Sequence, residues 1–157
     1  MEVGVPSQLV VFRLGEQGYA LPLAAVDRIV HAVEVTPLPG APPTVVGVID
    51  VGGDVLPVFN LRRRFLLPER KVSPADQFLI ARTANQRVAL VIERAWGVVE
   101  YLEAEIIESA HILPGLELIQ GVVQLEDGLV LIHDLEKFLS LEEAHALSSA
   151  MDRHPGC

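Results

Sequence analysis

Apolar and polar residues alternate in short runs along most of this chain, a pattern typical of β-strands rather than of long helices. The clearest example runs from Val45 to Phe65, where β-branched and apolar residues lie on both sides of Gly52-Gly53-Asp54. Such residues suit a buried pleated surface, and glycines can take the positive φ angles that tight hairpin turns require. We therefore predict a β-hairpin here, with Pro57 at an edge or at an irregular position of its second strand.

The chain contains this pattern twice. Gly47 recurs as Gly121, 74 positions further along and within a segment that aligns without gaps. An upstream block, residues 8–23, recurs as residues 77–92 at an offset of 69. Two blocks repeated in the same order at nearly equal offsets indicate a duplicated unit of about seventy residues, present in two copies rather than in a solenoid array.

We expect a first repeat over approximately residues 8–70 and a second repeat over 77–139. Residues 23–30 carry apolar side chains at a spacing that fits a short helix or a bent strand equally well. Residues 34–43 contain four of the eleven prolines and are expected to form a rigid loop. A capping-box pattern begins at Ser140, which predicts a C-terminal helix over 140–151.

The composition indicates a globular protein with an acidic surface. Half of the residues are hydrophobic and 21% are charged, so the chain can bury a core. The formal net charge of -9 argues against binding to nucleic acid or to an anionic membrane. The single cysteine is Cys157, which leaves no disulfide framework, and no apolar run reaches the roughly 18 residues of a membrane span. We expect a soluble cytoplasmic protein without membrane insertion.

No catalytic constellation stands out. His133 and Asp134 are adjacent, but neighbours on a strand point to opposite faces of the sheet. The other histidines lack metal-ligand spacing, and no phosphate-loop pattern follows the glycines. We expect no catalytic residues, no cofactor and no metal. An enzyme remains an alternative if Asp50, Asp54 or the His133-Asp134 pair meet in a deep pocket with shifted pKa values.

The only basic run is Arg62-Arg63-Arg64, extended by Arg70 and Lys71. Nucleic-acid binding would require a basic surface with interleaved aromatic residues, and this acidic chain lacks that pattern. We expect a solvated surface or a protein contact instead.

Five motifs, in order, resemble the CheW-like family of bacterial chemotaxis coupling proteins. They are LVVFRLGEQGYALPLAAVDRIV, TPLPGAP, VVGVIDVGGDVLPVFNLRRRF, VALVIERAWGVV and IQGVVQLEDGLVLIHDLEKFL, and they cover residues 8–139. The resemblance implies an all-β fold of two tandem five-stranded SH3-like barrels, with a C-terminal helix, in one domain over residues 8–151. Closed barrels also leave no exposed sheet edges.

The resemblance further implies a non-enzymatic coupling role in two-component signalling. Members of the family link a CheA-type histidine kinase, through its regulatory domain, to the cytoplasmic tips of methyl-accepting chemoreceptors. By motif, Val26 and Arg28 of VDRI, and Gly47 and Gly52 of GVIDVGG, match positions that the family uses in these protein contacts. Asp54 follows on the same turn. The alternative is a repurposed barrel that self-associates or binds a kinase without ordinary receptor coupling.

Two positions depart from the family pattern. The family motif is approximately GVINLRG, with an arginine where this chain has Gly52. The VxEI motif carries an acid where this chain has Arg28. Both changes alter the electrostatic complementarity that selects a partner. We therefore expect a coupling protein tuned to a non-standard receptor or kinase cluster.

Overall fold

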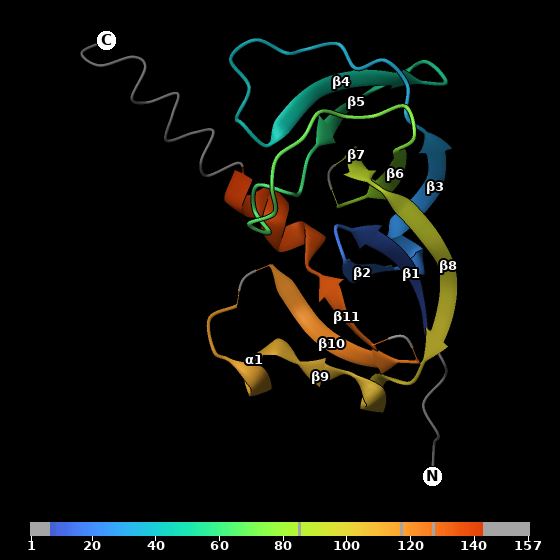
Figure 1. Ribbon diagram of the computed structural model, residues 1–157, viewed down its shortest axis with the longest axis vertical. Helices are drawn as coiled ribbons and strands as arrows, with labels where there is room; N and C mark the ends of the chain where they lie inside the picture. The colour runs from blue at the N-terminus through green and yellow to red at the C-terminus, as the bar shows by residue number, and fades with distance from the viewer. Residues whose placement is uncertain (1–6, 85, 117, 127, 143–157) are drawn as a thin grey trace, which may run out of the picture.

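Two curved β-sheets lie one above the other in the computed structural model (Figure 1). The structure describes residues 7–84, 86–116, 118–126 and 128–142. Sheet A has the strand order β8-β1-β2-β11-β10-β9, and sheet B has the order β3-β6-β7-β5-β4. The predicted all-β class is confirmed.

The strands of sheet A are β1 (Ser7–Leu14), β2 (Gln17–Pro22), β8 (Arg94–Tyr101), β9 (Ile107–Glu108), β10 (Ile119–Leu125) and β11 (Gly128–His133). The strands of sheet B are β3 (Val26–His31), β4 (Val45–Val51), β5 (Asp54–Phe59), β6 (Gln77–Arg82) and β7 (Arg87–Ile92). Short helical turns cover Leu23–Ala25 (η1), Glu103–Glu105 (η2) and Ser109–Ile112 (α1).

The central predicted hairpin is confirmed as β4 and β5. Gly52 and Gly53 form its two-residue turn with φ angles of 60° and 96°, as such turns require. Pro57 lies in β5, which is not the edge strand of sheet B. The parallel pairing of β5 with β7 involves only Val58 and Phe59, so Pro57 lies just outside that ladder, where its missing N–H costs nothing.

The sheets divide the chain differently from the repeats. Strands β1 and β2 belong to the first repeat, yet they lie in sheet A with β8 to β11 of the second repeat. In return, β6 and β7 of the second repeat lie in sheet B with β3 to β5 of the first. The expectation that residues 8–70 and 77–139 each form one barrel is therefore wrong. The first hairpin of each repeat therefore lies in the sheet that contains the later strands of the other repeat.

The exchange of strands is symmetric between the two repeats. Both sheets show an irregularity of register at the same place, beside Gly47 in β4 and beside Gly121 in β10. A Cβ atom on Gly47 would lie 2.2 Å from the carbonyl oxygen of Thr36, and one on Gly121 would lie 2.7 Å from Cγ2 of Ile106. Glycine is needed at both positions because a neighbouring segment crosses close to the strand.

Residues 23–30 combine the two forms that the pattern left open. Leu23–Ala25 forms one 3-10 turn, and the chain then continues directly into β3. The proline-rich segment 34–43 contains no helix or extended strand, as predicted, and only Thr36 forms an isolated bridge, with Val48 of β4.

The C-terminal helix begins earlier than predicted. Residues 135–142 are helical, so Ser140 lies inside the helix and is not its N-cap. The cap is Asp134, whose carboxylate accepts a hydrogen bond of 3.0 Å from the backbone N–H of Lys137. The remainder of the helix predicted over 140–151 lies outside the described residues.

The buried apolar residues form three clusters: a central one that contains residues of both sheets, one within sheet A and one within sheet B. In β1, Val10 and Phe12 join a central cluster that also contains Leu79 of β6 and Phe138 of the helix. The alternate residues, such as Val11, join a smaller cluster within sheet A. Because the middle of β1 is buried on both faces, residues 9–12 form a continuous apolar run. The central cluster packs the two sheets against each other and so fixes the position of one sheet relative to the other.

Candidate functional site

A row of ion pairs crosses four neighbouring strands at one end of sheet B. Asp27 of β3 accepts hydrogen bonds from Arg82 of β6, at 2.8 Å, and from Arg87 of β7, at 3.0 Å. Arg87 also pairs with Asp54 of β5. Arg28 lies beside this row, with its Nε 3.6 Å from the Asp27 carboxylate. We call these five residues the charged belt.

Asp27 reaches the two arginines because of a bulge in β3. Val26 pairs with Ala81 and Arg28 pairs with Ile80, so Asp27 is an extra residue without a partner in the ladder. The Asp27 side chain is only 18% exposed. The hydrogen bond from Arg87 is the main cause that lowers the pKa of Asp27 below its ordinary value. Asp27 is thus ionised at neutral pH and fixes the positions of both arginines.

Four of the five residues predicted from the motifs lie at this end of sheet B. Arg28 and Asp54 belong to the charged belt and have side chains that are 56% and 63% exposed. Gly52 is at the tip of the β4–β5 turn, where a Cβ atom would have no heavy atom of the described residues within 4 Å. Val26 begins β3 and packs partly buried against the central cluster. Arg28, Gly52 and Asp54 are therefore accessible to a partner.

Gly47 is different, because it is buried beneath the proline-rich loop. The loop residue Thr36 exchanges two backbone hydrogen bonds of 2.9 Å with Val48, directly beside Gly47. The close approach of Thr36 leaves no room for a side chain at Gly47. Its contribution is to hold the loop against β4 and thereby to shape the surface around it.

Sequence reasoning did not identify Asp27, Arg82 or Arg87. Arg82 and Arg87 flank the turn between β6 and β7 and face each other in the register of that hairpin. That placement could have suggested a paired site. Their common partner Asp27 is 55 and 60 residues away in the chain, and a local pattern does not connect such distant residues.

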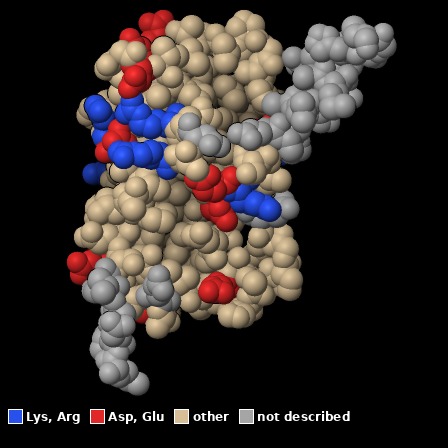
Figure 2. Space-filling view, turned by 180° about the vertical axis from the view of Figure 1, so that it is seen from behind, with Lys and Arg blue, Asp and Glu red and all other residues tan. Residues whose placement is uncertain are grey.

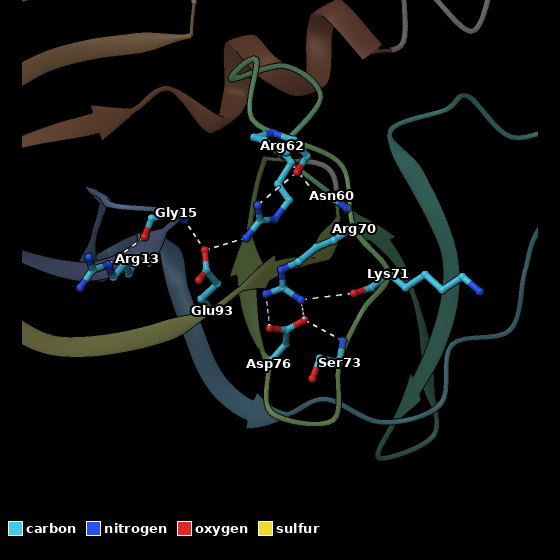
Figure 3. A network of polar contacts seen from close by, with 10 residues as sticks. Arg13, Gly15, Asn60, Arg62, Arg70, Lys71, Ser73, Asp76 and Glu93 are labelled. Carbon is cyan, nitrogen blue, oxygen red and sulfur yellow. Dashed lines mark hydrogen bonds and ion pairs between the residues drawn. The ribbon is translucent and has the colours of Figure 1, made fainter.

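The arginine run, in the segment between β5 and β6, is largely neutralised by carboxylates (Figure 3). Arg62 is 8% exposed and donates to Glu93 at 2.6 Å, and Arg70 donates two hydrogen bonds to Asp76. Arg64 pairs with the buried Glu142 at 2.6 Å. On the face shown in Figure 2, Lys and Arg side chains likewise lie next to Asp and Glu. The run therefore ties the segment between β5 and β6 to its carboxylate partners elsewhere in the fold.

The groups considered for catalysis do not converge. His133 is buried between the rings of Phe65 and Phe138, and burial lowers its pKa to about 4. Asp50 accepts from the Gly53 N–H in the exposed turn, far along the chain from the Asp134 helix cap. Within the described residues there is no cluster of three metal-ligating side chains. No helix in that part of the chain is long and apolar enough to cross a membrane.

Comparison with known proteins assigns the chain to a family. Residues 8–143 match the model of the CheW-like domain. The chain is 28% identical over 148 residues to a chemotaxis protein CheW of Treponema pallidum, covering 90% of this chain and 87% of that protein. It is 29% identical over 150 residues to a chemotaxis protein CheW of Bacillus subtilis, covering 92% and 94%.

A solved structure supports the same assignment. The scaffolding protein TtCheW from Thermoanaerobacter tengcongensis superposes with a TM-score of 0.75 at 26% identity, over 83% of this chain and 90% of that chain. The two curved sheets thus correspond to the paired SH3-like barrels that the motifs implied. The family model spans both sheets and the start of the C-terminal helix, and the chain belongs to the CheW-like domain family.

Proposed function

We propose that this chain is a non-enzymatic coupling scaffold of a chemotaxis-type two-component system. In this role it links the regulatory domain of a CheA-type histidine kinase to the cytoplasmic tip of a methyl-accepting chemoreceptor, and it works in the cytoplasm. The observation that carries the proposal is the CheW-like match over residues 8–143, together with relatives named chemotaxis protein CheW.

The geometry of the charged belt supports a docking role. Its cations and anions are held in fixed positions by hydrogen bonds across β3, β6, β7 and β5. Exposed charges on a rigid sheet select partners by electrostatic complementarity and contribute less to affinity than to specificity. Arg28 and Asp54 present opposite charges at the two ends of the belt, on β3 and β5, which suits a partner surface that also carries both signs.

The two departures from the family motif point to an altered partner preference. Arg28 places a cation where the family pattern has an acid, and Gly52 removes a cation from the hairpin tip. Both positions are accessible, so a change of residue at either one alters the charge that a partner meets. We propose that this scaffold serves a receptor or kinase whose charges complement the changed surface.

The test is a calorimetric titration of the full chain with the regulatory domain of a CheA-type kinase encoded in the same genome, at moderate salt. We expect saturable one-to-one binding with a Kd of about 1 μM to 10 μM, a range common for transient signalling contacts. Arg28→Ala should weaken binding to the kinase or, in a parallel titration, to the receptor tip. Arg94→Ala, which removes an exposed cation from β8 instead, is the matched control.

Absence of binding to every such kinase domain of that genome would refute the coupling role. The alternative would then be a repurposed barrel acting through self-association, which sedimentation velocity measures directly. The named relatives favour coupling over that alternative.

A further inference from the structure

A cavity of about 730 Å³ opens at one end of sheet A. Its walls come from β1, β8, the β1–β2 turn and the end of the β10–β11 hairpin. The lining includes Gly18, Trp96, Val98, Leu125, Leu129 and Val130. We call this cavity the Trp96 pocket. None of the motif residues at the end of sheet B contributes to it.

The Trp96 pocket occupies the position in sheet A that the charged belt occupies in sheet B. Trp96 lies 69 positions after Asp27, and like Asp27 it is the bulge residue of its strand, because Val11 pairs with Gly97 and Phe12 with Ala95. Arg13 faces Gly18 across the β1–β2 hairpin, as Arg82 faces Arg87 across β6–β7. The two ends are therefore equivalent parts of the duplicated unit.

The equivalent positions carry opposite chemistry. Trp96 replaces Asp27, and Gly18 replaces Arg87, so the two side chains that anchor the belt have no ionic counterpart here. Gly128 lies 74 positions after Asp54 and likewise has no side chain. In sheet B these side chains fill the end of the sheet and pair with one another. In sheet A their loss opens a pocket beside an indole ring.

The pocket is apolar in its walls and acidic at its rim. Trp96, Val98 and Leu129 are 46%, 50% and 56% exposed, which is unusual for large apolar side chains grouped together. Glu16 and Glu126 carry the only formal charges among the lining residues that the structure describes.

The ring and the rim are held in place. The Arg13 guanidinium lies 5.6 Å from the Trp96 ring centroid, a cation–π contact. Gln17 donates to the Leu129 carbonyl at 2.8 Å, which joins the start of β2 to β11. A pocket whose walls are fixed before binding loses little entropy when a partner enters.

We propose that the Trp96 pocket is a second protein-binding site, which takes an apolar side chain flanked by lysine or arginine from a partner protein. The apolar group removes Trp96, Val98 and Leu129 from water, and the flanking cation meets Glu16 and Glu126. This site lies on a different sheet from the charged belt and does not depend on the coupling function.

The test begins with a random peptide library displayed on phage and selected on the full chain, with counter-selection on Gly18→Arg. That variant introduces an arginine, the residue type of Arg87 at the equivalent position in sheet B, and its side chain fills the pocket. A Cβ atom on Gly18 would meet Val130 at 3.4 Å and Trp96 at 3.7 Å, which are ordinary contacts. We expect the enriched peptides to share an apolar residue next to lysine or arginine.

Binding of one enriched peptide is then measured by the fluorescence of Trp96, which is the only tryptophan in the chain. We expect a saturable shift of the fluorescence emission. The affinity of Gly18→Arg should be at least tenfold weaker, and it is measured by calorimetry because that variant changes the surroundings of the indole. Glu16→Lys should weaken binding several-fold, whereas Glu34→Lys, an equal charge change on the exposed proline-rich loop, should not.

Three outcomes would overturn the proposal. They are failure to enrich any peptide that depends on Gly18, enrichment of acidic peptides, and equal effects of Glu16→Lys and Glu34→Lys. Concentration-dependent self-association that Gly18→Arg abolishes would assign the pocket to a second copy of this chain instead. Because none of these measurements uses a kinase or a receptor, their failure is distinct from failure of the coupling proposal.

Discussion

The Arg87 guanidinium donates to the Asp27 carboxylate at 3.0 Å, although the two residues are 60 positions apart in the chain. Together with Arg82, this contact lowers the pKa of Asp27, so the contact stabilises the folded state whenever Asp27 is ionised. The stabilisation is present above the ordinary carboxylate pKa of about 4, and is lost as the pH falls through the lowered pKa of the folded state.

We therefore predict that Asp27→Asn lowers the free energy of unfolding at pH 7, and that the difference from wild type disappears at strongly acidic pH. Urea unfolding at pH 7 and at strongly acidic pH measures the free energy of unfolding of the variant and of wild type. Asp50→Asn is the matched control, because it removes the same charge from an exposed residue whose described bond is to the Gly53 N–H. An equal loss in both variants at pH 7 would mean that the belt contacts have no specific stabilising effect.

His133→Phe should remove an acid sensitivity of the fold. His133 is buried, its Nε2 has no hydrogen-bond partner among the described residues, and burial lowers its pKa to about 4 from an ordinary value of 6.5. The unfolded chain thus binds a proton between these values and the folded chain does not. Stability contributed by the neutral ring is complete above pH 6.5, and up to roughly 3 kcal/mol is lost as the pH falls to 4.

The substitution is compatible with the packing, because Phe59 occupies the equivalent position in the first repeat and packs against Phe138. Urea unfolding at pH 7, 5.5 and 4 should show a smaller decline for His133→Phe than for wild type. The exposed His31→Gln serves as control. A constant difference between wild type and His133→Phe over this range would contradict the prediction.

Gly47→Ala should be among the most destabilising single substitutions in the first repeat. Its Cβ atom would lie 2.2 Å from a backbone oxygen of Thr36, so the proline-rich loop must move and the Thr36–Val48 hydrogen bonds must break. We expect a loss of about 3 kcal/mol. Gly121→Ala should cost less, because the nearest atom belongs to the movable side chain of Ile106.

Chemical denaturation measures the free energy of unfolding of all of these variants. Gly18→Ala is the control, since its Cβ atom would make only ordinary contacts. Equal stability of Gly47→Ala and Gly18→Ala would show that the loop moves aside without cost.

The double substitution Gly52→Arg with Arg28→Glu restores the charges of the family motif. The structure has space for the new arginine, although the positive φ angle of 60° at Gly52 costs about 1 kcal/mol for a residue with a Cβ atom. We expect about a tenfold gain in affinity for an ordinary chemoreceptor tip, by charge complementarity. Calorimetry measures the gain.

Gly52→Arg with Arg94→Glu is the control, because it produces the same net charge with the acid on sheet A. No gain for the first variant, or the same gain for the control, would argue against altered partner preference at these two positions.

The sequence by itself determined the local structure of this protein. The hairpin turn at Gly52-Gly53, the duplication and the family motifs depend on residues that are close in the chain or repeated in order, and local pattern preserves such information. The position of Gly47 at a close backbone approach was also marked in the sequence, by its recurrence as Gly121.

Only the tertiary structure decided which strands share a sheet. A hairpin carries the same pattern whether it pairs with its own repeat or with the other one, and here β1 and β2 pair across the repeats. The charged belt and the Trp96 pocket follow from this exchange, because Asp27 meets Arg82 and Arg87 only when hairpins of different repeats lie in one sheet. Strand pairing between distant segments is set by burial in the shared core, which the order of residues along the chain does not reveal.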